Sequence, residues 1–103
     1  MKVIEKLSDK ISDEIQDAKC YAKMALEERE PHRSLADTLY TISNEEMRHM
    51  QMLHGEVARL IAEYRQAKGD PPADMLAVYE YLHRQHIDAA AEVRTLQAMY
   101  KEG

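Results

Sequence analysis

Residues 35–64 read LADTLYTISNEEMRHMQMLHGEVARLIAEY, and their apolar side chains return every three or four positions. This spacing is typical of one stripe along an amphipathic α-helix. The members of the stripe are Leu35, Leu39, Ile42, Glu46, His49, Leu53, Val57, Leu60 and Tyr64. Two of them are polar, so an otherwise apolar helix face carries a carboxylate and an imidazole one turn apart. Gly55 interrupts the helix at a cost of about 1 kcal/mol relative to Ala, which indicates either a close helix contact or a tolerated defect.

Helix breakers divide the rest of the chain. Pro31 follows a run of acids, and Gly69-Asp70-Pro71-Pro72 ends the helical pattern described above. Proline cannot continue a helix, and glycine commonly closes one. The sequence of 103 residues therefore predicts one all-α domain, 1–103, with helices at about 2–29, 32–68 and 73–102.

The first predicted helix also carries a carboxylate within its apolar stripe. The stripe consists of Ile4, Leu7, Ile11, Glu14, Ala18, Tyr21 and Ala25. A short turn at Pro31 makes the first two helices an antiparallel hairpin. Glu14 lies about 17 residues before that turn and Glu46 about 15 after it, which at about 1.5 Å per residue places them near the same level. We therefore expect the two carboxylates to face one another.

Composition restricts the classes of partner. The formal charge of −5 argues against nucleic acid and anionic membrane surfaces. The single Cys20 rules out an internal disulfide or a multi-cysteine metal site within one chain. No apolar run approaches the roughly 20 residues of a membrane span, and the N-terminus becomes polar too early for a signal peptide. We therefore expect a cytoplasmic protein.

Glu46 and His49 form a Glu-x-x-His motif. This spacing directs a carboxylate oxygen and an imidazole nitrogen from adjacent turns toward one point. Such donors suit iron or manganese, and zinc also accepts them. Together with Glu14, the motif predicts a metal site within the helical hairpin.

Two segments resemble a known family. Residues 13–22, DEIQDAKCYA, resemble the first helix of ferritin-like proteins, and residues 42–49, ISNEEMRH, are similar to the second helix of rubrerythrins and encapsulated ferritins. The resemblance covers roughly residues 5–65. It implies that Glu14 is the first-helix ligand, Glu46 the bridging carboxylate and His49 the terminal imidazole. It also implies a ferroxidase-type oxidoreductase that oxidises Fe(II) with dioxygen or peroxide.

The chain supplies half of the ligand set of a two-metal carboxylate bundle, which needs a Glu from each of two helices and Glu-x-x-His from each of two more. We therefore expect dimerisation to complete a four-helix ferritin-like bundle with two irons per dimer, within a homodimer or a higher even homo-oligomer. Asp17 and Tyr21 are candidates for hydrogen bonds that orient His49 or a bound oxygen species. Encapsulated ferritins also suggest an encapsulin-type shell as partner, but residues 97–103 show no obvious targeting extension. A rubrerythrin's paired-Cys segment and second hairpin are absent as well.

The third helix is less diagnostic. A second Glu-x-x-His, Glu80 to His83, lies one residue off its apolar stripe, and Glu80, His83 and Glu92 are candidates for an accessory metal-uptake site. His86 lies on the stripe and is interpreted as a buried or interfacial imidazole. The alternative for the whole chain is a non-catalytic helical oligomerisation protein, in which Glu14, Glu46 and His49 form a polar core network without metal.

Overall fold

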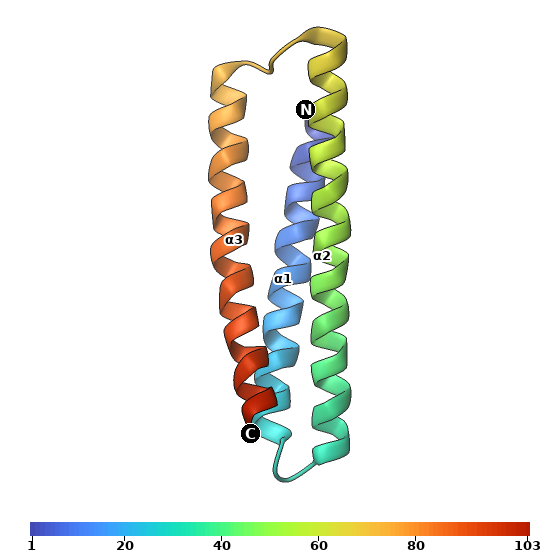
Figure 1. The fold of residues 1–103 in the computed structure, drawn as a ribbon, viewed down its shortest axis with the longest axis vertical. Helices are drawn as coiled ribbons and strands as arrows, with labels where there is room; N and C mark the ends of the chain where they lie inside the picture. The colour runs from blue at the N-terminus through green and yellow to red at the C-terminus, as the bar shows by residue number, and fades with distance from the viewer.

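The computed structural model describes residues 1–103 and consists of three long helices (Figure 1). Helix α1 spans Lys2–Glu28, α2 spans Arg33–Lys68 and α3 spans Ala73–Glu102. The all-α prediction is confirmed, and each predicted helix end lies within one residue of the observed one. The molecule is a rod of 56 × 19 × 17 Å, because helices of this length can pack only along their sides.

The two connections follow from the local sequence. At the first, His32 precedes α2 and its backbone N–H donates to the Glu28 carbonyl at 2.8 Å. At the second, the Gly69 N–H donates to the Arg65 carbonyl at 3.0 Å, and Gly69 has a φ of 81°. That left-handed conformation suits glycine, which has no Cβ to clash. Pro72 then precedes the first turn of α3.

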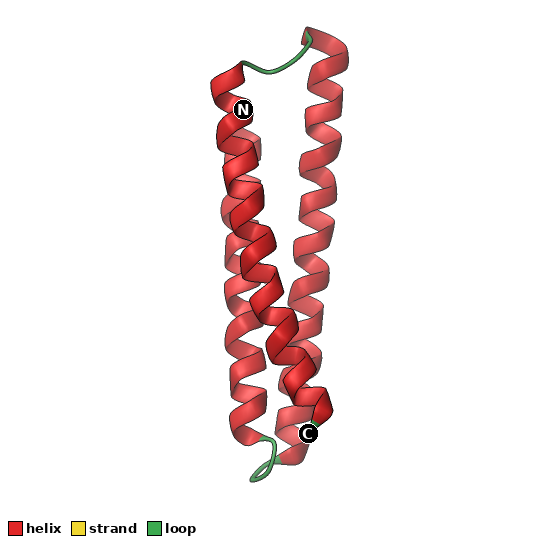
Figure 2. Ribbon diagram, turned by 60° about the vertical axis from the view of Figure 1, so that its left-hand side comes forward, coloured by secondary structure: helices red, strands yellow, loops and turns green.

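Helix α1 lies between the other two. It packs along most of α2 and along α3, whereas α2 and α3 contact each other little. Helices α1 and α3 run in the same direction and α2 runs antiparallel to both (Figure 1). In Figure 2 the ribbons of α2 and α3 are apart in the upper half of the view, and α3 crosses obliquely in front of the hairpin toward its C-terminus. The hairpin of α1 and α2 is therefore the main structural unit, with α3 attached to its α1 side.

The core depends on small side chains in α1. Ala18, Ala22 and Ala25 are completely buried, which permits close approach of the neighbouring helices. One apolar cluster comprises Ile11, Ile15, Ala18, Met47 and Val93, and a second comprises Ala25, Ala36, Leu39 and Tyr100. Each cluster draws on all three helices, so α3 belongs to the same core as the hairpin.

One buried polar link crosses this core. The Ser43 hydroxyl of α2 donates to the Ala18 carbonyl of α1 at 2.7 Å. The same hydroxyl accepts a hydrogen bond from the Gln97 amide of α3 at 2.9 Å. A buried hydroxyl and amide are thereby paired within the protein, which avoids the cost of unsatisfied polar groups.

The buried line of α2 differs from the predicted stripe by about one position. The structure buries Ala36, Leu39, Ser43 and Met47, whereas Leu35 is 48% exposed. Small residues such as Ala36 and Ser43 occupy the close contact between helices, and larger apolar residues lie at its edge. Gly55 has no atom within 4 Å of the position of a Cβ, so it is a tolerated defect and not a close contact.

Candidate metal centre

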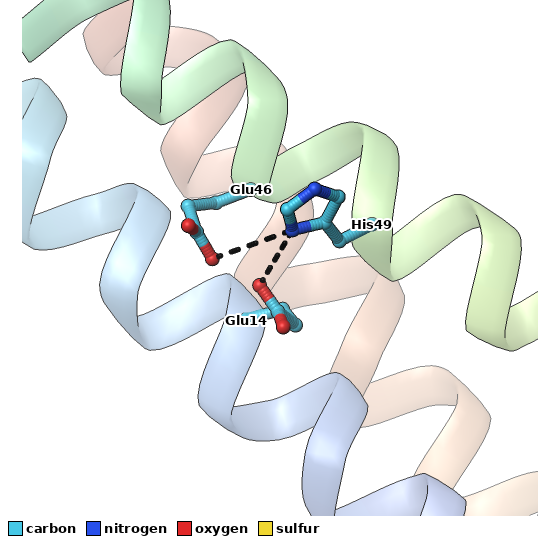
Figure 3. Close-up of side chains that lie close together, drawn as sticks. All are labelled: Glu14, Glu46 and His49. Carbon is cyan, nitrogen blue, oxygen red and sulfur yellow. Dashed lines mark ion pairs between the residues drawn. The ribbon is translucent and has the colours of Figure 1, made fainter.

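The three predicted site residues come together on the hairpin. Glu14 projects from α1, and Glu46 and His49 project from adjacent turns of α2 (Figure 3). One ligand atom from each of the three lies within 4.8 Å of the others. The expectation that Glu14 and Glu46 lie at the same height along the hairpin and face one another is therefore confirmed.

The imidazole is directed toward both acids. Its Nδ1 lies 3.5 Å from Glu14 Oε2 and 4.0 Å from Glu46 Oε2. The side chains of Glu14 and Glu46 are 24% and 19% exposed, and that of His49 is 52% exposed. Two carboxylates are thus withdrawn from water, while the imidazole remains open to solvent.

Without a cation, the two neighbouring carboxyl groups cannot both be ionised without electrostatic repulsion. Glu14 Oε2 is buried and has no hydrogen-bond partner. The nearby Glu14 carboxyl, which can share a proton with Glu46, raises the pKa of Glu46 to about 7, and burial and the negative charge of Glu14 act in the same direction. The charge of His49 lowers the pKa of Glu46 and that of Asp17 raises it, both by smaller amounts. The metal-free site therefore retains a proton near neutral pH.

The donor set fits a first-row divalent cation. Bonds of about 2.1 Å place donor atoms no more than about 4.2 Å apart across the ion, so a spread of 4.8 Å needs only small side-chain rotations. Carboxylate oxygens with one imidazole suit iron, manganese or zinc. A cation would also give the buried Glu14 Oε2 a closer partner than His49 Nδ1, which lies 3.5 Å away.

The site lies on the face of the hairpin away from α3. Ser12 and Lys19 of α1 contact α3, and they lie about 140–160° around the helix from Glu14 at about 100° per residue. In Figure 3 the α3 ribbon passes behind the three side chains. Half-buried or exposed apolar residues flank the site on this face, and we call them the open face: Val3, Leu7, Tyr21, Leu35, Ile42, Leu53 and Leu60.

Asp17 and Tyr21, the candidates for orienting His49 or a bound oxygen species, lie one and two turns from Glu14 on α1. Neither forms a hydrogen bond with His49; Asp17 is exposed, and Tyr21 packs against the cluster around Ala25. Asp17 influences the site through its charge, which raises the pKa of Glu46.

The expected accessory site on α3 is not assembled as predicted. Glu92 pairs with Lys19 of α1 at 2.9 Å, and its distance from His83 along the helix is about 14 Å. His86 is buried as expected, and its Nε2 contacts the Ser12 hydroxyl at 3.0 Å.

The sequence interpretation missed the contact between His54 and His83. His54 Nε2 and His83 Nδ1 lie 2.9 Å apart, and the two rings stack with centroids 4.6 Å apart. A signal was present, because His54 lies 15 residues before Gly69 and His83 lies 11 after Pro72. Those separations place the two rings at similar levels once α2 and α3 are antiparallel.

We predict that the metal-free protein loses stability relative to its Glu46→Gln variant as pH rises from about 4.5 to about 7. The pKa of Glu46 is raised from 4.5 to about 7, so the folded state binds more protons than the unfolded state in this window. Stability from the protonated carboxyl is present below pH 4.5 and is lost as pH passes through 7. Urea unfolding in the presence of a chelator measures this difference, and a constant difference across the window would contradict the raised pKa.

None of the three helices carries an apolar stretch long enough to cross a lipid bilayer. Comparison with known proteins provides no relative to guide the assignment of the site: no family model, curated protein or solved structure matches this chain.

Proposed function

We propose that this chain is a ferritin-like two-metal carboxylate protein that binds and oxidises ferrous iron. The observation that carries the proposal is the convergence of Glu14 with Glu46 and His49, in which the buried Glu14 Oε2 has no hydrogen-bond partner. Two acids and one imidazole from two helices form half of the ligand set used by such proteins.

The proposed active unit is a two-fold dimer. A second copy facing the first across the open face would contribute the other two acids and imidazole, giving four helices around two metal ions. The apolar residues of the open face support this arrangement, because in a single chain Leu35 is 48% exposed and Val3 is 46% exposed. A partner with the same face buries these side chains and withdraws His49 from solvent.

In this proposal iron is the substrate, and the protein contributes position and charge. Two Fe(II) ions each give one electron to dioxygen, which takes up two protons and leaves as hydrogen peroxide. With peroxide as oxidant, the same two electrons and two protons yield two water molecules. Glu46 releases its proton when a cation binds, and its carboxylate then balances part of the cation's charge.

Anaerobic loading with ferrous iron tests the proposal directly. We expect one iron per chain by elemental mass spectrometry, a dimer or higher even oligomer by light scattering, and oxygen consumption after air is admitted. Manganese and zinc are measured in the protein as purified. A monomer that retains none of the three metals would contradict the proposal.

A second candidate function is a non-catalytic helical assembly protein. The observation that favours it is the raised pKa of Glu46, since a proton held between Glu14 and Glu46 stabilises the cluster without metal. An oligomer that forms with full affinity yet binds no metal would support this second function.

A further inference from the structure

A groove lies on the other side of the hairpin, between α2, α3 and the N-terminal half of α1. Its volume is about 350 Å³, and 8 of its 14 lining residues are hydrophobic. Its polar wall includes His54 from α2 and both Glu80 and His83 from α3. The groove is therefore a largely apolar space whose polar lining includes three imidazoles, those of His54, His83 and His86.

The two imidazoles are held as a pair. His54 Nε2 lies 2.9 Å from His83 Nδ1, and the rings are stacked at 21° to one another. His86, one turn beyond His83, lines the same groove but its Nε2 contacts Ser12 of α1. The contact with Ser12 anchors α3 to α1 beside the pair and leaves His54 and His83 as the adjacent donors.

We propose that His54 and His83 bind one late first-row divalent cation, of which Zn²⁺ is the type, and that this cation links α2 to α3. Two nitrogens bound tetrahedrally at about 2.0–2.1 Å lie about 3.3 Å apart, so the facing nitrogens must separate by about 0.4 Å. The stacked rings must also rotate, so that the in-plane lone pairs of both nitrogens point at the ion. Water molecules would fill the remaining positions.

The protonation of the pair is compatible with this role. Burial lowers the pKa of His54, and the charge of a protonated His83 lowers it further. Neutral imidazole is the form that binds metal. The ring that carries the shared proton passes it to its other nitrogen, so both facing nitrogens become free to bind without net proton release.

This site is separate from the centre at Glu14, Glu46 and His49. His54 and His49 lie about 140° apart around α2 at about 100° per residue, so their side chains project to different sides of the helix. The two sites share no residue, and the inference does not depend on the proposed iron chemistry.

Zinc binding here would have a mechanical effect. Helices α2 and α3 contact each other little, and the His54–His83 pair is one of the few links between them. A ligand that binds only the folded state stabilises it. We therefore expect zinc to raise the melting temperature of the protein and to do so through the attachment of α3.

The experiment uses the full chain carrying Glu46→Gln, which weakens the first site, and measures zinc by equilibrium dialysis. We expect one zinc per chain. Adding His54→Asn or His83→Gln removes a zinc ligand, so the zinc affinity should fall by more than the roughly 10- to 100-fold that is typical when a residue contacting a ligand is replaced. The matched control is His32→Asn, because His32 is an exposed histidine paired with Glu28.

Circular dichroism without zinc establishes that each variant is folded, and the melting temperature is measured with and without zinc. The expected shift is present in the Glu46→Gln and His32→Asn backgrounds and lost in both variants of the pair. Unchanged zinc affinity in folded His54→Asn and His83→Gln variants would overturn the proposal. An equal loss in the His32→Asn variant would also overturn it, because binding would then be nonspecific.

Discussion

Replacing Glu46 by Gln should reduce iron binding by at least about 100-fold and abolish oxygen consumption. In the proposed dimer Glu46 would be one of the groups that hold the cations, so its loss should weaken binding, and even the loss of a group that only contacts a metal ligand costs roughly 10- to 100-fold in metal affinity. Gln has the same shape and nearly the same helix propensity as Glu, so the helix should persist. Iron content after anaerobic loading and the rate of oxygen uptake measure the effect.

The matched control is Glu45→Gln. Glu45 is exposed and adjacent in the same helix, so its replacement makes the same change in net charge outside the cluster. Iron binding should remain within about twofold of the wild type, in line with a surface charge that contributes little. If Glu46→Gln retained full iron content, or if both variants lost iron equally, the site assignment would be wrong.

Replacing Ile11 by Ala should lower the free energy of unfolding by about 2–5 kcal/mol, the range for large-to-small changes in a packed core. Ile11 is 1% exposed and belongs to the cluster formed by α1, α2 and α3. Because 5–15 kcal/mol is typical of a whole domain, the variant should approach the limit of stability. Urea unfolding at one fixed protein concentration measures the change.

The control for this change is Ile87→Ala on α3. Ile87 is 53% exposed, so the same deletion should alter stability by no more than about 0.5 kcal/mol. Equal destabilisation by the two substitutions would contradict the core described above and would indicate that Ile87 is buried in an assembly.

Much of the fold was predictable because its signals are local. Pro31 and the Gly69–Pro72 segment end helices through their own backbone chemistry, whatever surrounds them. The level of Glu14 opposite Glu46 followed from the constant rise of a helix and one short turn. These features require no knowledge of packing.

The remaining features depend on contacts between distant residues. The stripe predicted from the sequence consists mainly of large apolar side chains. In the structure, the close contact between α2 and its neighbours is formed at Ala36 and Ser43, because small residues let helices approach. The packing of α3 against α1, with little contact to α2, depends on how the side chains of the three helices fit together. The His54–His83 pair follows from that attachment and was therefore missed.

The buried link from Ser43 to Gln97 has a consequence for the register of α3. Apolar contacts are non-directional, so a helix displaced by one turn of about 5.4 Å can regain much of its buried area. Hydrogen bonds have narrow distance limits, and such a slip would leave the Gln97 amide without its buried partner. The loss of this one hydrogen bond therefore opposes sliding of α3 more sharply than the surrounding apolar contacts do. Together with the contacts of His86 with Ser12 and of Glu92 with Lys19, this bond holds α3 at the height at which His83 lies beside His54.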